Sequence, residues 1–208
     1  MVSNSKYTFS LTGASALITE TMIIAQEYDR LKDWKLVENA LVDNNLLNKI
    51  KQSTFKREFR EIKKRLQQLS TPQIKLMIQG DLEDAKAMIL LALIKTYSYL
   101  RDFIIEVLRN KFNQFDKILT EADYTRFFNT KSLVHTELTE ISESTSKKVK
   151  QVLFKILEQI GLITQTKNGA ILKPYFNKQV LKLIATDDRA LLAGFLLSDA
   201  EINALTKP

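Results

Sequence analysis

The fold is decided by the stretch Ser53-Thr-Phe-Lys-Arg-Glu-Phe-Arg-Glu-Ile-Lys-Lys-Arg-Leu-Gln-Gln-Leu69. Its apolar residues recur at alternating intervals of four and three, the period of one face of an α-helix. They are Phe55, Phe59, Ile62, Leu66 and Leu69. At about 100° per residue, five cations fall together on another side of that helix. They are Lys56, Arg57, Arg60, Lys63 and Lys64. With Ser53 or Thr54 as N-cap, the stretch predicts a helix that packs one face on a core and turns a basic face to solvent. A solvated face with snorkelling lysines is the alternative reading.

The segments before this stretch give the first part of the chain the order of a helix-turn-helix. Thr12 or Ser15 can cap a first helix that runs to about Arg30, and a second helix is expected at about 33–44. Two helices, a turn and then a basic helix is the order expected when the recognition helix comes last. Any three-helix bundle shares that order, so the basic face is what favours DNA. We assign residues 1–132 to an N-terminal helical domain that holds this motif.

A second basic amphipathic helix is expected at Ser144–Ile160, inside a C-terminal domain of residues 133–208. A weaker helix at Leu133–Ile141 precedes it. One side of the basic helix is apolar, and Lys150 lies near the boundary between the two sides. The polar side carries Lys147, Lys148, Gln151 and Lys155.

Asn168-Gly169 follows that helix and separates two short apolar-containing runs, at 162–167 and 170–174. This dipeptide between such runs is the strongest local signal for a β-hairpin. A basic helix followed at once by a hairpin is the winged-helix arrangement, in which Lys167 would lie at the wing tip beside a phosphate backbone. A helical domain with an incidental hairpin is the alternative.

Composition favours an all-α protein of one or two domains. The order of its elements adds two helix-turn-helix motifs, the second winged by a short β-hairpin. The chain has 208 residues, 45% of them hydrophobic and 26% charged, with only 5 Gly and 3 Pro. The longest apolar run, Ala87–Ile94, is far short of the ~18–20 residues that span a bilayer. Met1–Thr12 lacks the apolar core of a signal peptide. No membrane association and a cytoplasmic location are therefore expected.

Further helix starts can be read from capping residues, and the N-terminus has a pattern of its own. The capping candidates are Ser70, Asp81, Thr120, Asn177, Asp187 or Asp188, and Ser198. Tyr7, Phe9 and Leu11 alternate, which indicates either a short strand or an arm docked on the core.

Positive charge is concentrated on the two basic helices. The formal net charge is +7, whereas 49–65 holds eight Lys or Arg against two Glu and 144–155 holds four Lys and no acid. Since these segments exceed the charge of the whole chain, the sequence favours an anionic partner. Arg57, Arg60 and Gln151 can read base edges, while lysines more often contact phosphates.

Residue sets that carry catalysis or bind metals are not evident. The chain has no Cys, which excludes disulfides and thiolate ligands, and no Gly-rich phosphate loop. The single histidine, His135, is expected on a surface without a base or orienting partner. Asp187-Asp188 is better read as a helix cap, because adjacent carboxylates on a helix point apart. We therefore expect no enzyme activity, no catalytic or metal-binding residues and no cofactor.

Several stretches together resemble the BrxA family of bacterial BREX phage-exclusion systems, over essentially the whole chain. They are Ser10-Leu-Thr-Gly-Ala-Ser-Ala-Leu17, Phe59-Arg-Glu-Ile-Lys-Lys-Arg-Leu66, Lys95-Thr-Tyr97, Val107-Leu-Arg-Asn-Lys-Phe112, Ser144-Thr-Ser-Lys-Lys-Val-Lys-Gln-Val-Leu-Phe154 and Leu197-Ser-Asp-Ala-Glu-Ile202. The resemblance implies a NusB-like, all-α protein with two helix-turn-helix motifs that binds double-stranded DNA. It also implies work alongside a BREX methyltransferase, an ATPase and a phosphatase-like protein.

The leading hypothesis is thus a monomeric, non-enzymatic protein of phage defence that binds double-stranded DNA. The DNA-binding residues expected are Lys56, Arg57, Arg60, Lys63, Lys64, Lys147, Lys148, Gln151, Lys155 and Lys167. RNA binding, which a NusB-like architecture permits, and a protein scaffold that meets acidic surfaces of other BREX proteins are the alternatives.

Overall fold

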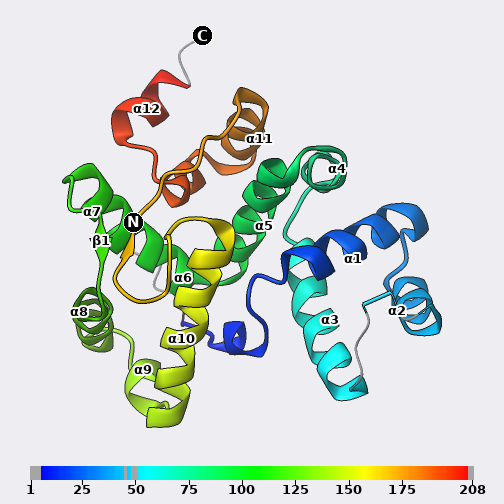
Figure 1. Cartoon of the computed structure of the whole chain (residues 1–208), viewed down its shortest axis with the longest axis horizontal. Coiled ribbons are helices and arrows are strands. Elements are labelled where there is room, and N and C mark those ends of the chain that lie inside the picture. Colours follow the sequence, from blue (N-terminus) through cyan, green and yellow to red (C-terminus); the bar gives the residue numbers. More distant parts are fainter. Residues whose placement is uncertain (1–5, 45, 48–50, 206–208) are drawn as a thin grey trace.

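Helix α5 (Leu82–Thr96) runs through the middle of the fold with helices packed on both sides of it (Figure 1). The computed structural model describes residues 6–44, 46–47 and 51–205. Buried side chains run almost unbroken from Ala85 to Ile94, because apolar residues lie all round this helix. The predicted cap Asp81 accepts a hydrogen bond of 2.9 Å from the backbone N–H of Asp84. The helix therefore serves as the centre on which the other apolar faces pack.

The elements before α5 form one side of the molecule. They are η1 (Ser10–Gly13), α1 (Ile18–Leu31), α2 (Trp34–Asp43), α3 (Gln52–Leu66) and α4 (Thr71–Gln79). Trp34 lies at the junction of three of these helices, stacked on Tyr28 at 4.0 Å between ring centroids and edge-on to Phe59 at 6.3 Å. The apolar residues predicted for the basic stretch are buried, so α3 packs on the core through that face.

The elements after α5 form the other side. They are α6 (Ser98–Phe103), the π-helix η2 (Ile104–Arg109), α7 (Asn110–Asn113), β1 (Ile118–Leu119), α8 (Glu121–Ser132), α9 (Glu137–Glu140), α10 (Glu143–Ile160), β2 (Gly169–Ala170), α11 (Lys178–Asp188), η3 (Arg189–Phe195) and α12 (Asp199–Ala204). Tyr97 has extended backbone, with φ of −122° and ψ of 95°, and separates α5 from α6. Helical structure then continues without interruption from α6 through η2 to α7.

The short sheet joins two distant parts of the chain. β1 pairs antiparallel with β2, with Ile118 opposite Ala170 and Leu119 opposite Gly169. The predicted hairpin is reduced to a single bridge between Ile163 and Ile171 with its flanking backbone hydrogen bonds. This arrangement ties residues before 132 to residues after 133, and one cluster of buried apolar side chains likewise spans both parts.

Most predicted features of the helices are found in the structure, and the mainly helical fold is confirmed. The residues predicted to cap later helices do so: Ser70, Asp81, Thr120, Asn177, Asp188 and Ser198. The prediction for the first helix start was wrong, because α1 begins after Leu17, which has a left-handed backbone. Ser53 and Thr54 lie inside α3, which begins at Gln52. The helix expected at 133–141 shrinks to α9.

Candidate nucleic-acid interface

The five cations predicted for α3 divide into two groups. Lys56, Arg57 and Arg60 are exposed on the face opposite the core. Lys63 is half-buried, with Nζ 5.5 Å from the Trp34 ring centroid. Lys64 is also half-buried and donates a hydrogen bond of 2.9 Å to Ser10 Oγ. The first three are therefore free to meet an external anion, while the last two also hold α3 against its neighbours.

Arg65, at the end of α3, is not on the basic face at all. Its side chain is buried, and its Nε donates to the Tyr97 hydroxyl at 3.0 Å. That hydroxyl in turn donates to Glu61 Oε2 at 2.8 Å. Burial raises the pKa of Tyr97 to about 12, so the hydroxyl keeps the proton that it donates. The charge of Arg65 therefore contributes to the interior of the protein and not to a binding surface.

The predicted residues of α10 are exposed, but acidic neighbours balance part of their charge. Lys147 pairs with Glu143 at 2.6 Å and Lys155 pairs with Glu158 at 2.5 Å. Nζ of Lys148 donates to Oε1 of Gln151 at 3.3 Å. Because these ion pairs lie at the surface, they hold the lysines only weakly. The face remains basic, though less strongly so than the exposed part of α3.

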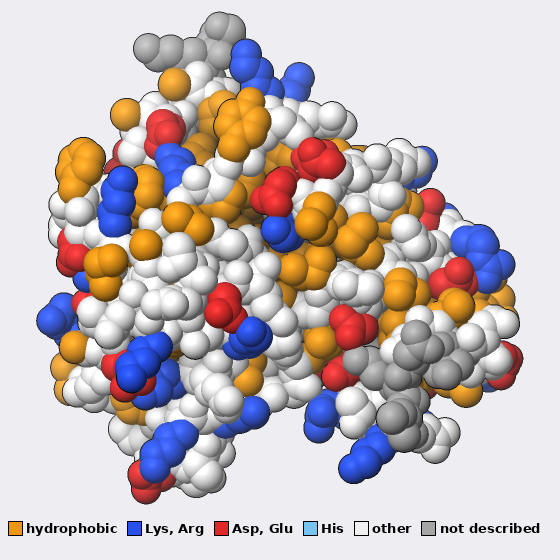
Figure 2. Space-filling model, viewed as in Figure 1, with side chains coloured by type: hydrophobic (Ala, Val, Ile, Leu, Met, Phe, Trp, Pro, Cys, Tyr) orange, Lys and Arg blue, Asp and Glu red, His pale blue; other side chains and the backbone are white. Residues whose placement is uncertain are grey.

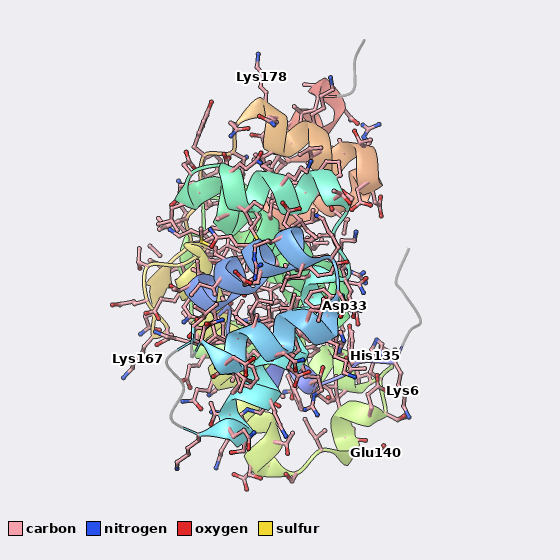
Figure 3. All side chains as sticks on the ribbon, turned by 90° about the vertical axis from the view of Figure 1, so that its right-hand side faces the viewer. Lys6, Asp33, His135, Glu140, Lys167 and Lys178 are labelled. Atoms are coloured by element: carbon pink, nitrogen blue, oxygen red, sulfur yellow. The ribbon has the colours of Figure 1, made fainter. Side chains whose placement is uncertain are left out.

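A cleft of about 530 Å³ lies between α10, the start of α8 and the loop of the hairpin. Lys167 lines it from the loop and Lys155 from the helix, and Glu158 is also in the lining. The cleft also contains Lys150, which the sequence had placed only at the edge of the polar face and which pairs with Glu121 at 3.2 Å. In Figure 3, Lys167 points outward, on the side opposite Lys6, His135 and Glu140. The hairpin loop and the basic helix thus present cations to one shared cleft.

The two basic helices reach the same edge of the molecule. In Figure 1, α3 and α10 both descend to the lower edge, with η1 between them. Figure 2 shows Lys and Arg side chains near this edge on both sides, and the outline recedes between them. The structure therefore brings together two basic surfaces from segments far apart in the sequence.

Comparison with known proteins supports the resemblance seen in the sequence. A family model described as BrxA matches residues 5–188. The chain belongs to the BrxA family. Two relatives are named "BREX protein BrxA". The relative from Bacillus cereus (strain H3081.97) is 29% identical over 155 residues, or 74% of this chain and 76% of that protein. The relative from Escherichia coli O9:H4 (strain HS) is 25% identical over 164 residues, or 78% and 77% respectively.

A solved structure shares the fold of this BrxA-family chain. It is the crystal structure of an uncharacterized protein from Magnetospirillum magneticum, with a TM-score of 0.78 at 19% sequence identity. The match covers 92% of this chain and 98% of that one. Nearly the whole helical arrangement is therefore common to both proteins.

The surface position predicted for His135 was wrong. Its ring is buried and stacks on Tyr7 at 3.9 Å between centroids, and its Nδ1 lies 3.1 Å from Glu137 Oε1. The Tyr7 hydroxyl donates to Asp102 at 2.8 Å. Of the two readings of the N-terminus, the docked arm is the one observed, and it covers the histidine. Among the described residues, no group of three or more His, Cys, Asp or Glu could hold a metal ion, and no helix is long and apolar enough to cross a membrane.

Gly169 is required where the hairpin loop closes in this BrxA-family protein. A Cβ at this position would lie 2.1 Å from the carbonyl oxygen of Gln165, which is backbone and cannot rotate away. Gly169→Ala is therefore expected to open the loop and to lower the free energy of unfolding by about 1–3 kcal/mol. Urea denaturation measures this, with exposed Thr166→Ala in the same loop as the control. Equal stability of the two variants would contradict the close approach.

Proposed function

We propose that this chain is a non-enzymatic, double-stranded DNA-binding component of a BREX phage-exclusion system. The names of the B. cereus and E. coli relatives support the BREX assignment. One observation carries the DNA part: Lys56, Arg57 and Arg60 are exposed on one face of α3, whose opposite face is buried. A rigid helix with cations on one face suits the major groove, which admits an α-helix.

The second half of the chain offers a second surface of the same kind. A strand, a helix, the short α9, a basic helix and a hairpin follow one another as β1, α8, α9, α10 and the loop before β2, with β1 paired to β2. This order supports a winged helix-turn-helix. In the proposal α10 faces the groove, and Lys167 meets the adjacent phosphate backbone.

The residues of the interface have different roles in this proposal. Arg57 and Arg60 can form bidentate hydrogen bonds to guanine, and Gln151 can do so to adenine. Lys side chains are point charges that neutralise phosphates and fix the register of the protein on the duplex. Lys63 and Lys64 are half-buried, so they would contribute to DNA binding mainly through the electrostatic potential of their charges and not through direct contacts.

Binding is expected to weaken steeply with salt, because cations that neutralise phosphates release condensed counterions. The exposed cations of the interface are Lys56, Arg57, Arg60, Lys147, Lys148, Lys155 and Lys167. If all of them contact phosphates, the slope of log affinity against log salt is about −6. Affinity should then fall by nearly four orders of magnitude, to within roughly a factor of three, between ~50 and ~200 mM salt. Fluorescence anisotropy with a labelled duplex measures the slope, and a slope near zero would overturn the proposal.

The same assay separates DNA binding from its rivals. An unlabelled RNA duplex of matched length and sequence should compete poorly, because its deep, narrow major groove excludes an α-helix. Competition equal to that of DNA would favour an RNA-binding protein. Absence of binding to either duplex, with co-purification of other BREX proteins after nuclease treatment, would favour a scaffold.

A further inference from the structure

The segment Ser10–Leu17 lies between the two basic helices. Its first turn, η1, packs against both α3 and α10 (Figure 1). Within it, Leu11, Ala14 and Ala16 are buried. Hydrogen bonds to each of the two helices hold the segment in this position.

On one side the segment is bonded to α3. The Arg65 guanidinium donates hydrogen bonds of 2.6 Å to the carbonyl oxygens of both Ala14 and Ser15. Gly13 lies close to the same helix, since a Cβ there would be 3.3 Å from Cγ of Glu61. A buried guanidinium that bonds consecutive carbonyls fixes the path of the backbone as well as its distance from the helix.

On the other side the segment is bonded to α10. The backbone N–H of Ala16 donates to Oε1 of Gln159 at 3.0 Å. Leu17, the next residue, has a φ of 51°, a left-handed conformation that leucine adopts only at a cost. Because α3 and α10 bond neighbouring peptide groups of one strained segment, neither can shift without disturbing the other.

The chain just before this segment is also anchored. The Tyr7 N–H donates to Glu137 at 2.6 Å and its hydroxyl donates to Asp102. The segment is thus held at its start, along its length and at its junction with α1. It has the contacts of a rigid spacer.

We infer that Ser10–Leu17 is a brace that holds α3 and α10 at a fixed separation, so that both basic faces engage one continuous DNA duplex. This inference rests on the proposed function and adds to it the kind of DNA preferred, a duplex of two or more helical turns. Once one basic face of a rigid protein has bound the duplex, binding of the second face costs little further conformational entropy. The two contacts together therefore bind more tightly than either one alone. The Lys and Arg side chains at one edge of the molecule suit the binding of one duplex along that edge (Figure 2).

The length of the duplex tests the brace. A ~12-bp duplex offers about one turn and a ~30-bp duplex about three, at the 10–10.5 bp of each turn. The protein is expected to bind the longer duplex at least about tenfold more tightly per site. Gln159→Ala, which removes one bond of the brace outside the interface, should reduce that gain about fivefold and leave the affinity for the short duplex unchanged. The exposed Gln79→Ala is the matched control.

The outcomes of this experiment are distinct. Binding to both duplexes without a gain for the longer one would overturn the brace alone. Failure to bind either duplex would overturn the proposed function and the brace with it. A gain that survives in Gln159→Ala would show that the bond to Ala16 does not couple the helices, and would also overturn the inference.

A distance measurement tests the brace without relying on affinity. The chain has no Cys, so spin labels can be attached at Ser53→Cys on α3 and Ser144→Cys on α10, both exposed. Double electron–electron resonance should give a narrow distance distribution that the ~30-bp duplex does not move. Gln159→Ala should broaden it and Gln79→Ala should not. A broad distribution in the parent protein, or one that shifts when DNA binds, would overturn the brace.

Discussion

Reversing the exposed charges of α3 in Lys56→Glu/Arg57→Glu/Arg60→Glu is expected to lower duplex affinity at least about 100-fold at ~100 mM salt. The three side chains are exposed on one face of α3, and Arg60 lies 4.0 Å from Glu61, which is itself buried. Reversal removes counterion release and base contacts together and adds repulsion toward phosphates. Fluorescence anisotropy with the ~30-bp duplex measures the loss, and the salt slope should become shallower.

A second triple variant separates a local contact from a general charge effect. Lys75→Glu/Lys178→Glu/Lys182→Glu changes the net charge by the same amount through exposed residues of α4 and α11. Lys178 lies at the end of the molecule opposite α3 (Figure 3). This variant should lose affinity less than about threefold, through weaker long-range attraction alone. Equal losses in the two variants would show that α3 is not the interface.

The corresponding reversal on α10 should have a smaller effect. Lys147 and Lys155 already have Glu143 and Glu158 as partners, so part of their charge is balanced before DNA arrives. Those ion pairs must also be broken or shared when a phosphate binds. The two helices, equal candidates by sequence, thus differ in the structure because of their acidic neighbours.

Local signals in the sequence predicted most of the helices. Thr120 before Asp123 and Ser198 before Glu201 form the capping boxes that their spacing indicates, and Ser70 before Thr71-Pro72 starts α4 as predicted. A capping box joins residues three apart, so it can be recognised from the sequence of a single helical turn. The apolar faces of α3 and α10 were predictable for the same reason, since a periodic pattern records which side of a helix is buried.

Contacts between distant segments could not be predicted in this way. His135 is buried because Tyr7, far away in the sequence, covers it, and β2 finds its partner in β1 and not only across its own turn. Arg65 did leave a local signal. At about 100° per residue it lies about 60° from Ile62, nearer to the apolar stripe of α3 than to the basic arc. A cation at that position predicts a buried partner, though the sequence does not say which one.

Arg65→Met is expected to lower the free energy of unfolding by about 3–5 kcal/mol, the usual loss when one partner of a buried charge network is removed. The side chain is 1% exposed, and its loss leaves the carbonyls of Ala14 and Ser15 without their donor. Glu61 would remain buried, with the Tyr97 hydroxyl still donating to it but without the buried guanidinium that the hydroxyl links it to. Urea denaturation followed by circular dichroism measures the change. Lys56→Met on the same helix is the control and should stay within about 0.5 kcal/mol, because its side chain is exposed.

Arg65→Lys distinguishes the geometry of the guanidinium from its charge. Lysine keeps the charge but has one nitrogen, which cannot donate to Tyr97 and to the carbonyls of Ala14 and Ser15 in the directions that the planar fork allows. We therefore expect a loss of about 2 kcal/mol, roughly that of two neutral hydrogen bonds. Glu61→Gln combined with Arg65→Met should cost less than the sum of the single changes, because the double variant leaves no uncompensated charge inside. If the losses of the two single variants simply add up in the double variant, Tyr97 does not couple the two charges. A loss below about 1 kcal/mol in Arg65→Met alone would mean that the network is not what holds α3 to the segment before α1.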